Sequence, residues 1–546
     1  MRRILWVWSL AVFAGLVLVE AAYYLGDFSP LRRIAAFYWI ACSVAIAVSA
    51  WLWAFSTFLE PGFWRLPGRA WYLVAFFLPP ALILLDGGGI RFSHIDAEGI
   101  QQLAAGTYLT RNDPSFGVYR MSYFTYLARQ FVLMALPSTF LGPSIWASRI
   151  GTTMIFTGSY LFFLAAILAW LRRIRMPDPA LFAAFCGTSI ALGHYVLLNV
   201  RKFEQTSMPI AVTLFFIAAL LLYATRPGPL SFLWVAWSFG FFPEVYTPAM
   251  GAWGLALVAL LYLIVRHRRF ALAPVALYGV LAVWIAYRVV NAEDKGTLGV
   301  KFRFGIERYT ASDWVYRYAH GVRSVVGSDF TLLPAPLALG LFAAAYLAWR
   351  QRDLRFAAVC VWSVAVAFVS LTFVGSNLNF PSHDIHRAMI IIPPLVVSMV
   401  YLLWRHLSQS PNPEVITRVA RFLAVVSMAY LVFTSVFTTV LVRNFFGLGT
   451  VDDYDEAFVK INQIVNDPAA PPIARIYLVP PLDIDLESGL QYFAPKADVV
   501  RSLPPKGEKK HGYWVFSYYK TNPDDRFLDE VVPSLHARPF LRMIPE

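Results

Sequence analysis

The sequence predicts a mainly α-helical bundle that crosses a membrane many times and carries a small α/β domain at its C-terminal end. Hydrophobic residues make up 58% of the 546 residues and charged residues only 14%, whereas about a quarter of a soluble protein is charged. Apolar runs of about 20 residues, the length that crosses a bilayer, recur over most of the chain. After residue 446 the apolar stretches shorten, and charged residues and prolines return.

The apolar runs predict about thirteen membrane-spanning helices. The first run follows Arg2 and Arg3 and lacks the small-residue exit site of a signal peptide, so we expect it to remain as the first helix. Cys42, Cys186 and Cys360 lie inside apolar runs, which indicates no disulfide framework in the exposed parts. The predicted spans cover residues 4–25, 34–59, 70–85, 150–171, 180–200, 208–224, 231–242, 250–265, 271–290, 332–348, 356–374, 389–404 and 422–442.

The basic residues predict the orientation of the helices. They fall on alternate loops, and the cytoplasmic loops of membrane proteins carry an excess of Lys and Arg. With the start of the chain inside and an odd number of spans, the acidic loop after the third span and everything after residue 442 lie outside. The net charge of +13 then follows from topology and attraction to anionic lipid, and we expect no nucleic-acid partner.

The chain therefore divides into a transmembrane domain over residues 1–446 and an exterior α/β domain over 447–546. Within the long exterior loop over 86–146, the aromatic segment around Arg120 predicts a helix at headgroup depth. A packed lid without substrate contact is the alternative. In the exterior domain, the pattern predicts helices over 452–466, 486–493 and 524–532 and strands over 476–479, 499–503 and 513–519.

An acidic pair, Asp96 and Glu98, opens a polar stretch shortly after the third apolar run. Carboxylates beside a bilayer are costly to keep dry, so a pair at the outer mouth of a helix bundle indicates a functional site. On an extended segment both side chains point the same way and could jointly hold a divalent cation such as Mg²⁺ or Mn²⁺, whereas on a helix they diverge. Alternatively, one of them caps a helix that starts near Gly99.

Two further exterior segments carry charge between apolar runs. Arg201 and Lys202 lie at the outer end of one span together with Glu204, where they could bind a phosphate. Snorkelling of the long side chains and helix capping would also explain them. Glu244 lies in a proline-bounded turn at the outer surface, and the turn itself is an alternative explanation for its position.

A fourth segment, residues 376–388, carries His383, His386 and Arg387 directly before an apolar run. A positive side chain at an outer helix start opposes both the basic-inside bias and the helix dipole, so Arg387 requires an anionic partner. A phosphate suits it, because a guanidinium can bind two oxygens at once. A salt bridge to Asp384 is the alternative.

A carboxylate base and several cations around a membrane-level groove predict transfer of a sugar from a lipid phosphate to a hydroxyl or amine. The carboxylate would take the acceptor's proton, and the cations would neutralise the departing phosphate. One rival is a transporter or flippase, which places ionisable residues near the bilayer midplane on broken or repeated helices. Another is a non-catalytic scaffold in cell-envelope assembly.

The pattern resembles the lipid-linked glycosyltransferases of the type C fold, in particular the branch of protein mannosyltransferases and lipid A aminoarabinose transferases. Three segments carry the resemblance: His-Ile-Asp-Ala-Glu at 94–98, Arg-Lys-Phe-Glu-Gln at 201–205, and His-Arg at 386–387 before Ile-Ile-Pro-Pro at 391–394. The branch usually has adjacent Asp and Glu, whereas Ala97 intervenes here.

The resemblance implies an inverting transferase that uses a polyprenyl-phosphate sugar, with Asp96 as the counterpart of the catalytic aspartate. It also implies a bacterial inner-membrane protein with a cytoplasmic N-terminus, a periplasmic C-terminal domain and a cell-envelope acceptor. Some relatives need a divalent metal and others do not.

Overall fold

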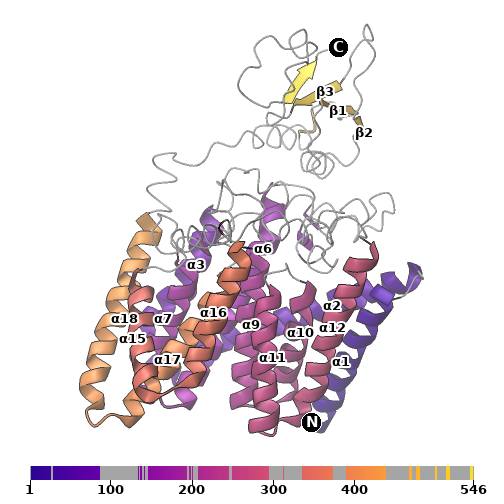
Figure 1. Cartoon of the computed structure of the whole chain (residues 1–546). Helices are drawn as coiled ribbons and strands as arrows, with labels where there is room; N and C mark the ends of the chain where they lie inside the picture. Colours follow the sequence, from indigo (N-terminus) through magenta and orange to yellow (C-terminus); the bar gives the residue numbers. More distant parts are fainter. Residues whose placement is uncertain are drawn as a thin grey trace.

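The computed structural model describes the helical part of the chain over residues 2–25, 29–86, 145–193, 207–244, 249–293, 335–372 and 389–437, with the single positions 133, 136, 137, 140, 141, 196, 197, 200 and 312. In the C-terminal part it describes residues 467–469, 475–479, 498–500, 512–516 and 541–544. The helices form a bundle, and a four-stranded sheet lies beyond the end of the bundle opposite the N-terminus (Figure 1).

Each described α-helix overlaps one of the predicted apolar runs. The helices are α1 Arg2–Leu25, α2 Ser29–Ser56, α3 Arg69–Asp86, α6 Ile145–Arg173, α7 Pro179–Ala191, α9 Ser207–Thr225, α10 Pro229–Phe241, α11 Ala249–Arg266, α12 Ala273–Glu293, α15 Ala335–Gln351, α16 Leu354–Thr372, α17 Ile392–Gln409 and α18 Pro413–Val436. Within the described ranges, six helices are long and apolar enough to cross a membrane, namely α1, α2, α6, α9, α17 and α18. Several others are apolar but shorter, so the helices indicate a membrane protein.

The centre of the bundle is formed by α6, α7 and α9. Helix α6 packs against α9, α7 and α2, and α7 packs against α3, α6, α17 and α18. Every residue of α7 from Ala180 to Ala191 is buried. Helices α1 and α18 instead expose many large apolar side chains, among them Leu18 and Phe433. Helices α1 and α18 therefore suit the boundary with lipid, because lipid tails are as apolar as their exposed side chains.

The predicted span over 180–200 is not one continuous helix, and that expectation was wrong. Helix α7 ends at Ala191, and the Leu192 N–H still donates to the Thr188 carbonyl. The Leu192 carbonyl accepts a hydrogen bond from the Ser435 hydroxyl of α18 at 2.7 Å. Helical bonding resumes when the Leu197 N–H donates to the Gly193 carbonyl. A glycine after a helix end and a side-chain cap from another helix explain the break.

Helix α3 continues through Pro79 and Pro80. Because proline has no N–H, Pro79 leaves the carbonyl of Ala75, four residues earlier, without its intrahelical donor. The Tyr160 hydroxyl of α6 donates to that carbonyl at 2.5 Å. Tyr160 is fully buried, so one side chain both packs α6 against α3 and satisfies the carbonyl that the proline frees.

We expect Tyr160→Phe to lower the free energy of unfolding by about 1–2 kcal/mol, because the Ala75 carbonyl then stays buried without a donor. Thermal unfolding of the purified protein in detergent measures the loss. The matched control is Tyr346→Phe, since Tyr346 is exposed and its hydroxyl has little to lose. Equal stability of the Tyr160 variant and wild type would contradict the role of this hydrogen bond.

Two glycines let α10 and α12 approach closely. Gly240 of α10 lies against the ring of Tyr278, and Gly279 of α12 lies against the ring of Phe239. A Cβ at either glycine would overlap ring atoms. Both rings are buried, so neither can swing out of the way. Small residues at such crossings are typical of helix pairs in membranes, where close backbone approach drives association.

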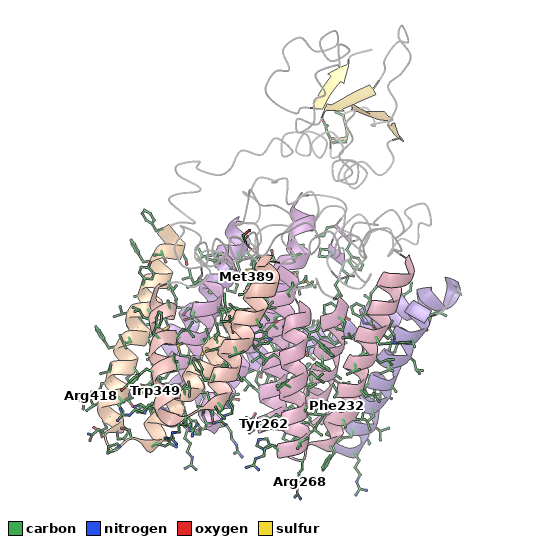
Figure 2. The ribbon with its side chains drawn as sticks, viewed as in Figure 1. Phe232, Tyr262, Arg268, Trp349, Met389 and Arg418 are labelled. Carbon is green, nitrogen blue, oxygen red and sulfur yellow. The ribbon has the colours of Figure 1, made fainter. Side chains whose placement is uncertain are left out.

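The turns that join α2 to α3, α6 to α7, α9 to α10, α11 to α12, α15 to α16 and α17 to α18 form one end of the bundle, which we call the basic end. Figure 2 shows Arg268 and Arg418 there, and Met389 toward the opposite end. The described arginines of the basic end are Arg65, Arg69, Arg172, Arg173, Arg175, Arg226, Arg266, Arg268, Arg269, Arg350, Arg352, Arg355, Arg405, Arg418 and Arg421.

Neighbouring turns of the basic end are linked by polar contacts. Arg172 of α6 pairs with Glu60 of the α2–α3 turn at 2.5 Å. Arg421 of α18 pairs with Asp178, the residue before α7. The Trp404 indole of α17 donates to the Ile174 carbonyl just after α6 at 2.9 Å. These contacts join helices that are far apart in the sequence.

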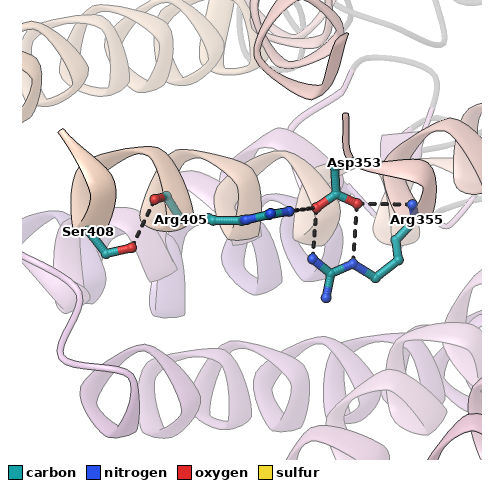
Figure 3. Close-up of polar contacts among 4 residues, drawn as sticks. All are labelled: Asp353, Arg355, Arg405 and Ser408. Atoms are coloured by element: carbon teal, nitrogen blue, oxygen red, sulfur yellow. Dashed lines mark hydrogen bonds and ion pairs between the residues drawn. The ribbon is translucent and has the colours of Figure 1, made fainter. Parts of the chain in front are cut away.

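Asp353, in the turn between α15 and α16, has the most contacts of this kind. Its carboxylate accepts hydrogen bonds from the backbone N–H and the guanidinium of Arg355 at 2.8–3.2 Å, and pairs with Arg405 of α17 (Figure 3). Arg355 also lies over the ring of Tyr401, 5.0 Å from its centroid. Burial alone would raise the pKa of Asp353, but the hydrogen bonds and charge of Arg355 lower it to about 2.

We expect Asp353→Asn to lower the free energy of unfolding at neutral pH by roughly 2 kcal/mol, discounted because Arg355 is half exposed to water. The folded-state pKa lies below the usual 3.8, so the carboxylate stabilises the fold above about pH 4 and loses this effect toward pH 2. Unfolding curves of wild type and variant should therefore converge over that window. A constant difference between them at low pH would contradict the assignment.

The C-terminal strands are β1 Arg475–Val479, β2 Asp498–Val500, β3 Gly512–Phe516 and β4 Leu541–Ile544. They form one sheet in the order β2-β1-β3-β4, with β1 parallel to β2 and β3, and β4 antiparallel to β3. Three of the strands coincide with the predicted strands, and β4 was not predicted. The helices predicted over 452–466, 486–493 and 524–532 lie outside the described residues.

Candidate functional site

Nearly all of the predicted site residues lie outside the described part of the chain. They are Asp96, Glu98, Arg120, Arg201, Lys202, Glu204, His383, His386 and Arg387. Of Glu244, only the backbone is described, as the last residue of the short helix η4, Phe242–Glu244. The structure therefore bears on the site through the helices that lead into these segments.

Three of those helices are neighbours. Helix α3 leads toward Asp96, α7 leads toward Arg201, and α17 begins shortly after Arg387. Both α3 and α17 pack against α7. Helices α3 and α7 start at the basic end, whereas α17 finishes there, so the last turns of α3 and α7 and the first turn of α17 point toward the opposite end. The described helix ends that border these three segments in the sequence therefore point toward one end of the bundle.

The start of α17 is buried in the bundle. A turn at Met389–Ile391 precedes the helix, and the residues from Met389 to Val396 are buried. Pro393 and Pro394 occupy the first helical turn, where a missing N–H costs no intrahelical hydrogen bond. The described chain thus begins, two residues after Arg387 in the sequence, at a buried helix N-terminus, whose dipole favours anions.

Glu244 belongs to a different part of the bundle. Helix η4 packs against α10, α11 and α12, and none of these is a main packing partner of α7. Its segment is therefore separated from the outer ends of α3, α7 and α17. Of the predicted polar segments, this one is the least suited to act with Asp96.

Glu20 is a buried carboxyl that the sequence reasoning missed. It lies in α1, is 1% exposed, and its carboxylate accepts a hydrogen bond from the Tyr278 hydroxyl of α12 at 3.4 Å. The signal was present, since a single acidic residue inside an apolar run indicates function or a specific partner. Helix α1 packs against α2, α10 and α12, on the side of the bundle that also carries Glu244.

A metal site can be tested only in part. Within the described ranges, no group of three or more His, Cys, Asp or Glu side chains could hold a metal ion. The two carboxylates predicted as cation ligands, Asp96 and Glu98, are outside those ranges. The prediction of a divalent cation therefore rests on their spacing in the sequence alone.

Comparison with known proteins gives no independent assignment. No protein-family model matches the chain, and no curated protein matches it.

Proposed function

We propose that the chain is an integral-membrane glycosyltransferase that moves a sugar from a polyprenyl-phosphate donor to a cell-envelope acceptor. The main support is the arrangement of α3, α7 and α17: α3 and α17 both pack against α7, and the helix ends that border the acidic segment and the two basic segments in the sequence point toward one end of the bundle. A carboxylate beside phosphate-binding cations at the bilayer surface is what such a transfer requires.

In the proposed reaction, the acceptor oxygen or nitrogen attacks the anomeric carbon of the sugar as Asp96 takes its proton. The bond between that carbon and the phosphate oxygen breaks on the opposite side, and its electron pair leaves with polyprenyl phosphate. The configuration at the anomeric carbon is inverted. Arg387 and Arg201 neutralise the phosphate as its charge rises, with Lys202 and His386 as further donors.

The break in α7 supports the same site. Helix α7 ends within the bundle, so the chain after Gly193 can take a direction of its own before it reaches Arg201. Irregular backbone at membrane depth is tolerated where it is buried in protein or lines a polar cavity.

We also propose a membrane topology for the chain. Thirteen membrane spans would place the N-terminus and the basic end in the cytoplasm, where arginines of membrane proteins concentrate. The predicted site and the C-terminal sheet, extended by helices into an α/β domain, would then share the periplasm. The bundle would hold the polyprenyl chain and the bilayer would supply the donor.

A transporter or flippase is the second candidate, and one observation favours it. Broken helices at membrane depth and buried acidic residues such as Glu20 are typical of transporters. A transporter would move its lipid intact, without breaking a bond. The two functions therefore differ in whether polyprenyl phosphate is released.

The deciding experiment supplies the purified protein in detergent with a panel of polyprenyl-phosphate sugars and an envelope extract as acceptor. A glycosyltransferase releases polyprenyl phosphate from its donor, and the sugar appears on the acceptor. If folded protein released nothing from any donor but moved a labelled lipid across reconstituted vesicles, the transporter would replace the proposal. Failure of both reactions would favour a non-catalytic scaffold.

A further inference from the structure

Three arginines of the basic end have a left-handed backbone. Their φ angles are 57° at Arg175, 53° at Arg268 and 52° at Arg352. Glycine adopts this conformation freely, whereas a side chain with a Cβ is disfavoured in it. Each arginine lies just beyond the end of a helix, respectively α6, α11 and α15.

The three helix ends have similar hydrogen bonds, which reach back five residues at the ends of α6 and α15 and six at the end of α11. The residue after each arginine donates its N–H to a carbonyl in the last turns of the helix, over distances of 2.9–3.1 Å: Met176 to Leu171, Arg269 to Leu263, and Asp353 to Ala348. This pattern closes a helix around one left-handed residue, which is usually glycine. Arginine therefore stands three times where glycine would be the relaxed choice.

The chain does use glycine elsewhere at this end. Gly68, just before α3, has a φ of 77°, and a Cβ there would contact the backbone and side chain of Leu181. Contact with a neighbouring helix requires glycine at that turn. At the three arginine turns the side chains are exposed, so the residue type is free to serve another purpose.

Two of these turns flank the end of α17. Trp404 donates to the Ile174 carbonyl, next to Arg175, while Arg405 pairs with Asp353, next to Arg352. Arg268 lies at the same end in Figure 2, where its side chain extends away from the bundle. The three turns thus present their guanidinium groups on one surface.

The carboxylates of this surface are already paired with other arginines. Glu60 pairs with Arg172, Asp178 with Arg421, and Glu414 with Arg418. Asp353 pairs with both Arg355 and Arg405. In the part of the chain that the structure describes, none of the three left-handed arginines forms an ion pair. The anion that complements them must come from outside these turns.

Exposed aromatic side chains beside these turns are typical of the depth of lipid headgroups. Trp349, Tyr262 and Phe270 are 77%, 47% and 66% exposed and lie within or next to the helix ends that carry Arg352 and Arg268. Aromatic residues gather where apolar tails meet polar headgroups. Arginines just beyond such a belt can reach the phosphates of the adjacent leaflet.

We propose that Arg175, Arg268 and Arg352 bind the phosphate groups of anionic phospholipids at the basic end. A guanidinium can bind two phosphate oxygens at once, and the tip of a turn leaves it open to a headgroup. Backbone strain that persists at three equivalent positions indicates function rather than packing. The proposal is independent of the reaction at the opposite end of the bundle.

The test compares phosphatidylglycerol with phosphatidylcholine as ligands of the full-length protein in detergent, with thermal unfolding as the readout. In the triple variant Arg175→Gly, Arg268→Gly and Arg352→Gly, we expect roughly 100-fold weaker apparent affinity for phosphatidylglycerol. In phosphatidylcholine the same variant should unfold at a temperature equal to or above that of wild type, because the backbone strain is relieved. If these arginines did not bind headgroups, the variant would keep its unfolding temperature in phosphatidylcholine and its affinity for phosphatidylglycerol would not fall.

A matched control removes three charges from helices at the same end. Arg69→Gln, Arg173→Gln and Arg350→Gln change exposed arginines of α3, α6 and α15. This triple is compared with Arg175→Gln, Arg268→Gln and Arg352→Gln, and it should weaken the affinity for phosphatidylglycerol clearly less. Equal losses in both glutamine triples would overturn the proposal in favour of diffuse charge. Equal stabilisation by inorganic phosphate or by an acidic peptide without lipid would overturn the assignment to headgroups.

Discussion

Asp96→Asn is expected to reduce sugar transfer by roughly 10²–10⁴-fold while leaving the fold intact, because asparagine cannot take the acceptor's proton. The rate of polyprenyl phosphate release measures the loss, and thermal unfolding in detergent checks the fold. The acidic segment follows the end of α3 in the sequence, so the substitution changes no residue of the described helices.

Two controls make the result specific. Glu98→Gln separates the two carboxylates: a much smaller loss assigns the base to Asp96, whereas an equal loss that depends on added Mg²⁺ or Mn²⁺ indicates a jointly held cation. Glu414→Gln changes an exposed carboxylate at the basic end and should leave the rate unchanged. Full activity of the Asp96 variant would remove Asp96 from the mechanism.

Gly279→Ala is expected to destabilise the protein by about 2–3 kcal/mol, because overpacking a filled contact forces side chains or backbone to shift. The added methyl group would overlap the ring of Phe239, which is fully buried and stacked on Trp253. The ring has no free space to move into. Unfolding in detergent and the yield of folded protein both report this effect.

The matched control is Gly254→Ala in α11, where a Cβ would meet no atom within 4 Å. Alanine is the better helix former by about 1 kcal/mol, so this variant should be as stable as wild type or slightly more stable. The same glycine-to-alanine change should therefore lower the free energy of unfolding at Gly279 and leave it unchanged or raise it at Gly254. If both variants were neutral, the close approach of α10 and α12 would not contribute to stability.

The positions of the helices could be predicted because a long apolar run in water-free surroundings can satisfy its backbone only as a helix. The break in α7 was missed, although Gly193 and His194 lie at this point of the sequence; one glycine and one histidine in an apolar run do not by themselves end a helix. The cap on the Leu192 carbonyl comes from Ser435, which is 243 residues away in the sequence. Local pattern contains no information about such a partner.

The sequence also did not predict which helices lie at the centre of the bundle and which lie at its outer boundary. The spans Ile150–Arg173 of α6 and Arg3–Ala22 of α1 have similar hydropathy, yet 83% of the first and 22% of the second is buried. Lipid and protein interior are equally apolar, so hydropathy does not distinguish them. Strand β4 was missed for a related reason, because its four residues gain their structure from pairing with β3.

For the candidate site, sequence reasoning supplied the residues and the fold supplied their neighbourhood. The adjacency of α3, α7 and α17 could not be derived from the motifs, because helix pairing depends on packing over the whole bundle. It brings together the helices that border the segments of Asp96, Arg201 and Arg387 in the sequence. The same packing separates Glu244 from them, which the sequence alone did not indicate.

The central position of α7 has a consequence for biosynthesis. Two of its stabilising contacts, from Arg421 to Asp178 and from Ser435 to the Leu192 carbonyl, are made by α18. At about 5–20 residues per second, a ribosome needs roughly 10–50 s to translate the chain between Leu192 and Ser435. During that interval this short helix must wait in the translocon or beside α3 and α6, and a chaperone that recognises incomplete bundles would meet the nascent protein at this stage.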